Sequence, residues 1–438
     1  MNEQSITKQS INKQPINKQL SSKDVYDIII VGGGMVGASL AVALLPLKLK
    51  VALVDEFEFG APSQPSYDDR AIALSYGSSL IFKGMGLWDE LKPKTTGINS
   101  IHVSDRGHFG AARLSAEKEN VPSLGYLVES KVLGQQLYQV LKNTDVDLIQ
   151  PASVKNLSES DNAVTLELEK NDELSQISAR LLVAADGTMS KIRELSGINI
   201  TRSDYKQSAI VSNVSTEKTH NGEAFERFTD NGPIALLPMS DNRCSLVWTQ
   251  NTEEGTENLD AVMAMSDEDF LNELGKEFGY RLGRFTRVGK RSTFPLSLVT
   301  ADKNTANRTV IIGNASHTLH PVAGQGLNLA LRDVAVLTDL VADLMGSNQT
   351  QSTINNVASL LSAYEETRKG DLKGTIQYTD SLVRLFSNDQ VLLGHARAGG
   401  LLAFDRLPPL RNWLTRKSMG INYRQSRLAR GLALRVAS

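Results

Sequence analysis

Three glycines at a fixed spacing follow a short apolar segment near the start of the chain. Gly32, Gly34 and Gly37 form the pattern GxGxxG directly after the β-branched run 26–31 (YDIIIV), and a helical pattern follows them. The first glycine of such a pattern permits a tight turn, the second lets the backbone approach a pyrophosphate, and the third lets the helix pack closely on the strand. Free amides at the helix N-terminus attract the phosphates. The pattern therefore predicts a dinucleotide site, without distinguishing FAD from NAD.

A carboxylate at the end of the next apolar run belongs with this loop. Asp55 comes 18 residues after Gly37, directly behind the run 50–54 (KVALV). An acidic side chain at about this spacing accepts hydrogen bonds from the ribose hydroxyls of a dinucleotide. We therefore expect Asp55 to lie beside the glycine loop.

A second polar turn, much later in the chain, also follows an apolar strand pattern. Asp186 and Gly187 come directly after the run 179–185 (ARLLVAA) and open the pattern DGxxSxxR, which leads into a helix. Two interpretations stay open from the residues alone. Either the turn contributes to the dinucleotide site, or Asp186 caps a helix whose Ser190 and Arg193 face solvent.

The densest cluster of glycine and polar residues follows a third apolar run, 309–312 (TVII), and a helix is expected to begin near Leu327. A reduced flavin carries negative charge at its pyrimidine edge, which a helix N-terminus stabilises. Pro321 suits the shaping of this loop, and its glycines suit close approach of the backbone to a flat ring. The loop therefore favours FAD. The residues expected to bind it here are Gly313, Asn314, Gly324, Gln325, Gly326, Leu327 and Asn328.

Two histidines within the same loop, His317 and His320, are three residues apart. No third His, Cys or carboxylate sits at metal-binding spacing, so we expect no metal. His320 is a candidate for proton transfer to or from a substrate. The alternative, which we favour, is hydrogen bonding within the loop.

The three turns come together only if the apolar runs before them share one sheet. The front of the chain alternates strand and helix, and uninterrupted apolar runs are typical of parallel strands with helices on both faces. We predict an α/β fold with a Rossmann-like FAD-binding domain of the glutathione-reductase type, discontinuous over residues 24–97, 123–202 and 296–350. Alternating patterns predict an inserted substrate domain of mixed β-sheet over 98–122 and 203–295, and residues 351–438 form a helical C-terminal region.

Bulk composition excludes several classes of protein. A formal charge of −2 over 438 residues gives no indication of a nucleic-acid partner. Cys244 is the one cysteine, so the chain has no internal disulfide, which fits a reducing compartment. No run approaches the roughly 20 apolar residues of a transmembrane helix. Residues 1–23 carry a degenerate pentapeptide repeat rich in Lys, Gln and Asn, and we expect a disordered tail or, alternatively, an amphipathic arm.

Together the three motifs resemble those of the class A flavoprotein monooxygenases, whose fold is that of para-hydroxybenzoate hydroxylase. The strings HPVAGQGLNLALRD (320–333), DDRAIALS (68–75) and FERFTDNGPIALLP (225–238) are similar to signatures of the ubiquinone-biosynthesis hydroxylases in that class. The resemblance covers residues 24–425. Most of the class carries Asp where this chain has Asn314, and that variant resembles the 2-octaprenyl-6-methoxyphenol hydroxylase branch.

The resemblance implies an activity and roles for single residues. NADPH or NADH would reduce FAD while docked transiently, and O₂ would then give a C4a-hydroperoxyflavin that hydroxylates a polyprenylated phenol in ubiquinone biosynthesis. Arg70 matches the position at the flavin edge, Asn314 that beside the ribityl chain, and the carbonyl of Pro321 would line the cavity at the ring face. With His320 as the proton-transfer candidate, the expected catalytic residues are Pro321, Arg70 and His320. The alternatives are an FAD-dependent reductase acting on a prenyl lipid and a non-catalytic subunit of a quinone-biosynthesis complex.

The C-terminal segment combines positive charge with apolar residues. Residues 391–438 hold nine Lys or Arg against one acid, Asp405, interleaved with leucines, Phe404 and Trp413. This composition suits anionic lipid or an acidic protein surface, although a solvated basic face of a helical domain is the alternative. Since a polyprenyl-phenol resides in the bilayer, we expect a cytoplasmic protein bound peripherally to the inner face of the cytoplasmic membrane. Other ubiquinone-biosynthesis subunits are the further partners expected.

Overall fold

The computed structural model describes residues 25–60, 70–107, 110–252, 258–346, 354, 356–386, 407–421 and 425–434. The expected N-terminal tail (1–23), residues 68–69 of the DDRAIALS string and much of the basic segment 391–438 lie outside these described residues. Of the basic segment 391–438, the structure therefore describes only residues 407–421 and 425–434.

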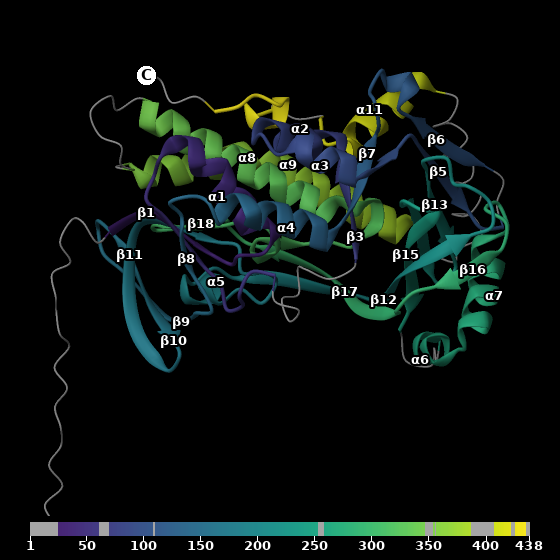
Figure 1. Cartoon of the computed structure of the whole chain (residues 1–438), viewed down its shortest axis with the longest axis horizontal. Helices are drawn as coiled ribbons and strands as arrows, with labels where there is room; N and C mark the ends of the chain where they lie inside the picture. Colours follow the sequence, from purple (N-terminus) through teal and green to yellow (C-terminus); the bar gives the residue numbers. More distant parts are fainter. Residues whose placement is uncertain are drawn as a thin grey trace, which may run out of the picture.

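The first sheet is assembled from segments far apart in the chain, as the sequence predicts (Figure 1). Its main strands are β1 (Val25–Val31), β2 (Val51–Val54), β8 (Asp147–Ile149), β11 (Glu173–Ala184), β18 (Thr305–Ala306) and β19 (Thr309–Ile311). They follow the order β18-β19-β11-β1-β2-β8. β1 pairs in parallel with β11 and β2, so that Ile29 lies opposite both Leu182 and Ala52. The three polar turns consequently follow β1, β11 and β19, which are neighbours at the same edge.

Alternate residues of β1 face two different cores, because successive side chains of a strand point to opposite faces. Ile28 and Ile30 pack into a layer of helices: α1 (Met35–Leu44), α4 (Ser130–Leu141), α8 (Gln325–Gly346) and α9 (Val357–Phe386). Ile29 and Val31 pack against β9 (Ser153–Glu159), β10 (Val164–Lys170) and the short helix α5 (Lys191–Leu195).

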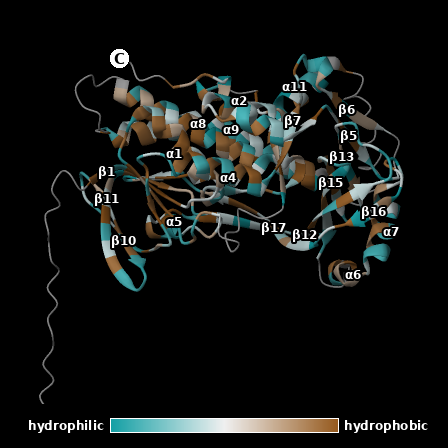
Figure 2. Ribbon diagram, in the orientation of Figure 1, coloured by the Kyte–Doolittle hydropathy of each residue, from teal (hydrophilic) through white to brown (hydrophobic). Residues whose placement is uncertain are grey.

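The sequence interpretation of helices on both faces is therefore wrong for the second face. β11 is 12 residues long, and its first half continues beyond β1 to pair with β10 in an antiparallel hairpin. That hairpin covers the face on which a second helical layer was expected. The apolar side chains of β10 substitute for those of a helix, and Figure 2 shows the strands between these layers as hydrophobic.

The second sheet is mixed, which confirms the interpretation of alternating patterns. Its strands are β5 (Ser100–Asp105), β6 (Ala111–Ser115), β12 (Ile200–Thr216), β13 (Glu223–Thr229), β14 (Gly232–Pro238), β15 (Arg243–Asn251), β16 (Phe285–Val288), β17 (Ser292–Ala301) and β20 (His317–Thr318). The order is β20-β17-β12-β15-β14-β13-β5-β6, and β16 pairs with β12. The long strands β12 and β17 run from this sheet toward the first one (Figure 1).

Two helices cover the outer face of the second sheet. They are α6 (Asn258–Ala264) and α7 (Asp267–Phe278). Phe270 of α7 packs edge-on against Trp248 of β15, with ring centroids 5.4 Å apart. The opposite face of the sheet lines a cavity, which is described with the candidate active site below.

A small third sheet lies where the other parts meet. It consists of β3 (Ala71–Ser75), β7 (Gly125–Glu129) and β4 (Thr96–Ile98). The helices α2 (Tyr76–Gly84), α3 (Trp88–Leu91) and α11 (Pro408–Ser418) belong to this region, and the amide of Gly77 on α2 donates a hydrogen bond to the carbonyl of Met419 just after α11.

Short 3₁₀ turns occur at several places along the described chain. They are η1 (Leu45–Leu47), η2 (Lys92–Lys94), η3 (Glu117–Glu119), η4 (Gly313–Ala315), η5 (Val322–Gly324) and η6 (Leu428–Arg430).

Candidate active site

The front glycines form a turn that no larger residue fits. Gly32 has φ +104°, and a Cβ there would lie 2.4 Å from the carbonyl oxygen of Ala185. A Cβ on Gly37 would lie 1.9 Å from the carbonyl oxygen of Gly32. Gly34 is the N-cap of α1 and supplies no side-chain bond to the first amides of the helix. These amides are therefore available to an anion, as a pyrophosphate-binding loop requires.

Asp55 lies beside the glycine loop, as its spacing predicts. Its Oδ2 accepts a hydrogen bond from the amide of Gly33, and its Oδ1 accepts one from the amide of Phe57 at 2.8 Å. Burial raises the pKa of Asp55, although these amides oppose the shift. A carboxylate held in this way presents its remaining lone pairs next to the glycine turn.

The second turn caps a helix, as one of the two interpretations of its residues predicts. Ser190 caps α5 by accepting from the amide of Arg193 at 3.0 Å, and Asp186 Oδ2 accepts from the amide of Ile192 at 3.1 Å. Arg193, however, is buried, and donates to the carbonyl of Ala315 at 2.9 Å and to that of Thr188 at 3.0 Å. The turn after β11 is thus tied to the turn after β19, and the part of the capping interpretation that has Ser190 and Arg193 facing solvent is wrong.

One carboxylate oxygen in this turn is left for a ligand. Oδ1 of Asp186 is buried and has no hydrogen-bond partner among the described residues. An acceptor in that state costs free energy unless something donates to it. Gly187, with φ +84°, has no atom within 4 Å of its Cβ position, so the turn is open on one side.

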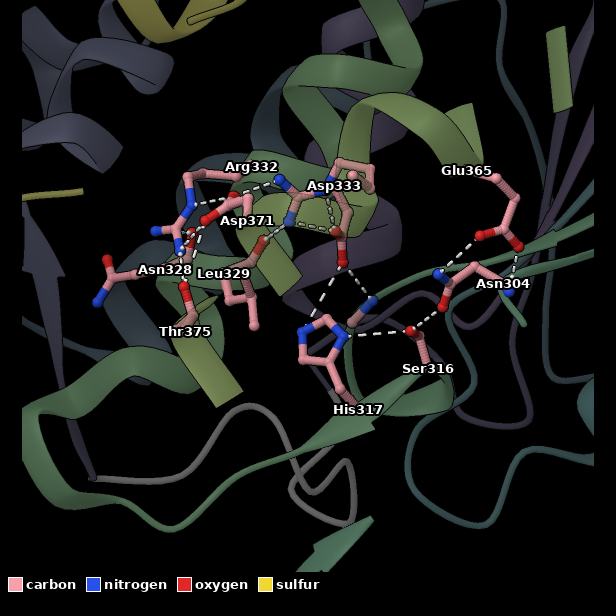
Figure 3. A network of polar contacts seen from close by, with 12 residues as sticks. Asn304, Ser316, His317, Asn328, Leu329, Arg332, Asp333, Glu365, Asp371 and Thr375 are labelled. Atoms are coloured by element: carbon pink, nitrogen blue, oxygen red, sulfur yellow. Dashed lines mark hydrogen bonds and ion pairs between the residues drawn. The ribbon is translucent and has the colours of Figure 1, made fainter. Parts of the chain in front are cut away.

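A buried ionic network holds the third turn against α8 and α9 (Figure 3). The amide of Gly313 donates to Oδ2 of Asp333 on α8 at 3.0 Å. Oδ1 of Asp333 accepts from Arg368 of α9, with a nitrogen–oxygen distance of 2.7 Å. Arg368 also pairs with Asp371, which in turn binds Arg332 at 2.8 Å. The loop that begins at Gly313 is therefore hydrogen-bonded to α8, and ion pairs join α8 to α9.

The charge states in this network follow from its geometry. Burial alone would raise the pKa of Asp371, but the positive charges of Arg332 and Arg368 outweigh it and lower the pKa to about 2. Burial works against the charge of Arg368, yet Asp333 and Asp371 raise its pKa overall. Arg368 and Asp371 are thus both ionised, and their opposite charges neutralise one another inside the protein.

The two histidines of the loop are enclosed rather than presented to a substrate. His317 is 2% exposed, its Nδ1 lies 3.2 Å from the hydroxyl of Ser316, and its Nε2 lies 3.9 Å from Asp333. His320 is 1% exposed, and its Nδ1 accepts from the amide of Val322 at 3.1 Å. Burial lowers the pKa of both, that of His320 to about 4. His320 does not line the cavity described below, so this placement favours hydrogen bonding within the loop.

The last part of the loop is held against β3. The side chain of Asn328 donates to the carbonyls of Ala73, at 2.8 Å, and Gly324, and its Oδ1 accepts from the amide of Ser75 at 2.7 Å. Gln325 donates to the carbonyl of Ala323 at 3.1 Å. These two predicted cofactor residues therefore use their side chains to position the loop. α8 begins at Gln325, two residues before the expected start.

A cavity of about 840 Å³ extends from this loop to the inner face of the second sheet. Predicted site residues that line it are Arg70, Asn314, Pro321, Gly324, Gln325, Gly326, Leu327 and Asn328. The guanidinium carbon of Arg70 lies 4.8 Å from the ring centroid of Phe294, and the carbonyl of Pro321 accepts from the amide of Gly324 at 2.9 Å. The Cβ position of Gly326 has no neighbour within 4 Å, which leaves room for a flat ring against the backbone.

Most of the remaining lining is apolar and comes from the second sheet and the C-terminal helices. It includes Val103, Ala112, Ala224, Phe228, Ala235, Leu237, Val247, Leu296, Leu382, Trp413 and Leu414. Two polar side chains, Glu226 of β13 and Tyr378 of α9, also reach it. Such a cavity suits a hydrophobic ligand with few polar groups.

Sequence reasoning missed four residues here: Glu226, Arg368, Asp371 and Tyr378. Glu226 stands inside a quoted signature string and alternates with Ala224 and Phe228, so period-two alternation was a usable signal. Arg368 and Asp371 are three apart on a helix, which also describes many solvent-exposed pairs. Only the packing of α9 on α8 distinguishes them.

The residues around the three turns fit FAD. Gly32 and Gly37 form a tight turn that admits no side chain at either position, and Asp186 keeps an unpartnered buried oxygen. The open space at Gly326 joins the cavity. Dinucleotide and flavin ends would then lie along one edge of the first sheet. No helix within the described part of the chain is long and apolar enough to cross a membrane.

Comparisons with known proteins identify an FAD-binding family. Residues 25–375 match the family model described as an FAD binding domain. The chain is 36% identical over 423 residues to ubiquinone hydroxylase UbiL of Rhodospirillum rubrum, covering 94% of this chain and 95% of that protein. It is 32% identical over 408 residues to 3-demethoxyubiquinol 3-hydroxylase of Escherichia coli, covering 90% of this chain and 98% of that protein.

The fold is also found among solved structures. That of p-nitrophenol 4-monooxygenase PnpA from Pseudomonas putida superposes with a TM-score of 0.73 at 15% identity. The superposition covers 92% of this chain and 99% of that one. The expected class of fold, with mixed sheets and a helical C-terminal region, is thereby confirmed.

Proposed function

The chain belongs to the FAD-dependent aromatic monooxygenases of the ubiquinone-biosynthesis hydroxylase group, and on that premise we propose that it hydroxylates a polyprenylated phenol with NAD(P)H and O₂. The cavity is the observation that carries the proposal. It holds about 840 Å³, is bounded by the cofactor loop at one end and is lined mainly by apolar side chains. An aromatic ring placed against the loop leaves apolar space for the first part of a prenyl chain.

The protein's own residues would perform three tasks in this reaction. The glycine turn, Asp55 and Asp186 would hold the dinucleotide portion, and the loop between Pro321 and Asn328 would hold the flavin ring. FAD, once reduced, would supply the activated oxygen that the ring receives. The apolar walls formed by the second sheet would orient the phenol and keep water away from the reacting atoms.

Several finer points belong to the same proposal. Arg70 and Pro321 are the proposed residues at the flavin edge and ring face, since both line the cavity beside the loop. NADPH or NADH would dock transiently, because the chain has no second GxGxxG. Asn314, in place of the Asp common in the class, supports the 2-octaprenyl-6-methoxyphenol hydroxylase branch as the proposed position in the group.

We further propose peripheral association with the inner face of the cytoplasmic membrane through the region of α11. Trp413 and Leu414 of this helix line the cavity, while Trp413 and Leu407 are 47% and 52% exposed. Arg411, Arg416 and Lys417 give the same helix a positive charge. A prenyl chain would then pass from the bilayer into the cavity beside this helix. The same surface would contact other subunits of ubiquinone biosynthesis.

The test is turnover with a defined substrate. Purified FAD-loaded protein receives a short-chain prenylated phenol, NADPH or NADH, and O₂, and the product is examined by mass spectrometry for one added oxygen atom. We expect NAD(P)H oxidation coupled to a hydroxylated product, and no turnover without O₂. Continued turnover under anaerobic conditions, with saturation of a prenyl double bond, would instead establish a reductase. Absence of any product in the presence of reducible FAD would support a non-catalytic subunit.

A further inference from the structure

Glu226 is directed into the apolar cavity by the register of its strand. On β13 it alternates with Ala224 and Phe228, and all three line the cavity. Its partners across the sheet are Ala235 on β14 and Val103 on β5, which line the cavity as well. Residues directly opposite in paired strands share a face of the sheet. Four neighbouring residues that line the cavity thus agree on the direction of this side chain.

The surroundings of Glu226 provide it with no partner of its own. No described residue donates a hydrogen bond to its carboxylate or forms an ion pair with it, and its immediate strand neighbours within the cavity are Ala235 and Val103. Burial raises the pKa of Glu226 to about 7. An unpartnered carboxyl group in an apolar cavity is costly unless a ligand supplies a donor.

The other polar groups of the cavity cannot accept a proton. Among the described residues that line it, Glu226 and Arg70 are the two charged ones. Burial, together with the charge of Glu226, raises the pKa of Tyr378, which therefore stays protonated as a donor. Lys417 lies 4.6 Å from the ring centroid of Tyr378 and adds a positive charge behind it. Of these charged or titratable groups, the carboxylate of Glu226 is the one that lines the cavity and can take up a proton.

We propose that Glu226 is a catalytic residue that binds the hydroxyl group of the substrate phenol and accepts its proton during oxygen transfer. The inference rests on the proposed function, because it takes the ligand to be a phenol. The phenolic O–H bond breaks, its electron pair stays on the phenol oxygen, and the proton bonds to a carboxylate oxygen of Glu226. The step transfers a proton only, so neither the phenol nor Glu226 is oxidised or reduced in it. The added electron density at the ortho and para carbons makes the ring a better nucleophile toward oxygen.

The first test measures binding without turnover. FAD-loaded protein, without NAD(P)H, is titrated with 2-geranylphenol and with its methyl ether, which lacks the donor and is larger by one methyl group. We expect the phenol to bind about tenfold more tightly than the ether, the effect of one hydrogen bond to a charged group. As pH rises from 6 to 8, ionisation of Glu226 should strengthen phenol binding and weaken ether binding. The other charged or titratable residues that line the cavity are Arg70 and Tyr378, and Lys417 lies against Tyr378. The variants below are therefore compared at equal pH.

Two variants on the same strand separate the role of Glu226 from a structural one. Glu226→Gln should reduce the preference for the phenol to about twofold and abolish the opposite pH trends. Glu223→Gln, three residues earlier on β13 and outside the cavity lining, should leave both unchanged. FAD content and the midpoint of thermal unfolding are measured for each. If Glu226→Gln does not fold, the wild-type comparison of phenol with ether across pH decides the question.

Turnover then distinguishes the two proposals. With NAD(P)H and O₂, Glu226→Gln should form hydroxylated product about 10²-fold to 10⁴-fold more slowly, with FAD reduction by NAD(P)H changed less than about threefold. If wild-type protein makes no hydroxylated product, the proposed function is wrong. If wild-type protein makes it and Glu226→Gln keeps both the phenol preference and the rate, only the role of Glu226 is overturned.

Discussion

The amide of Gly313, at the end of β19, donates a 3.0 Å hydrogen bond to Asp333, which lies two turns into α8. The same carboxylate binds Arg368 of α9, so one side chain joins the loop after β19 to two helices. Because all of these atoms are buried, the position of the loop depends on charges that lie behind it and do not reach the cavity.

Asp333→Asn should therefore lower stability and FAD retention together. The substitution leaves the buried Arg368 with one carboxylate in place of two, and removing one partner of a buried ion pair costs about 3–5 kcal/mol. Chemical denaturation and the FAD-to-protein ratio after gel filtration measure the two effects. Asp343→Asn is the matched control on the same helix, since Asp343 is exposed in its ion pair with Arg427 and should change stability by less than about 1 kcal/mol. Equal effects of the two variants would contradict this account of the network.

Gly37→Ala and Gly370→Ala should act in opposite directions. A Cβ on Gly37 would lie 1.9 Å from the carbonyl oxygen of Gly32, so this variant must open the turn and lose FAD. Gly370 is exposed within α9 and has no atom within 4 Å of its Cβ position, so alanine should stabilise the helix by about 0.5–1 kcal/mol. Thermal unfolding with and without added FAD gives both results. Retention of FAD by Gly37→Ala would show that the turn is not the phosphate loop.

His320→Asn should make the protein less sensitive to acid. The pKa of His320 is lowered from its usual value of 6.5 to about 4, so its contribution to stability is complete above pH 6.5 and is lost as pH falls toward 4. Linkage puts that loss at about 3 kcal/mol, and Asn can still accept from the amide of Val322. Denaturation series at several pH values should give a shallower slope for the variant, with His317 still contributing in the same range. A loss of hydroxylation far larger than any loss of stability would instead support His320 in proton transfer.

Leu407→Ser should weaken binding to anionic lipid vesicles about fivefold. Leu407 is half exposed at the N-cap of α11, and withdrawing its exposed part from a bilayer forfeits about 1 kcal/mol. Serine is a favourable N-cap residue, so the helix itself should persist. The control is Leu174→Ser, since Leu174 is 63% exposed on the hairpin of β10 and β11, far from α11 in Figure 1. Vesicle sedimentation that shows the same loss for both variants would argue against a membrane-facing α11.

Much of the site was accessible from local sequence because local sterics encode it. Gly32 and Gly37 are needed by a turn of six residues, and Asp55 follows a strand that must pair with β1. The start of α8, between glycines and apolar residues, was placed within two residues of its observed position. These features depend on backbone conformation and strand alternation, which neighbouring residues determine.

The sequence by itself thus determined the type of cofactor to expect, the sheet at whose edge the three turns lie, and the group of enzymes to which the chain belongs. Tertiary structure decided which buried charges support the loop, which layer covers the second face of the sheet, and which side chain stands in the cavity. Arg368 meets Asp333, and Glu226 comes within electrostatic reach of Tyr378, only when separate helices and sheets are packed together. Such partners are chosen by long-range packing, and no pattern of spacing within either segment specifies them.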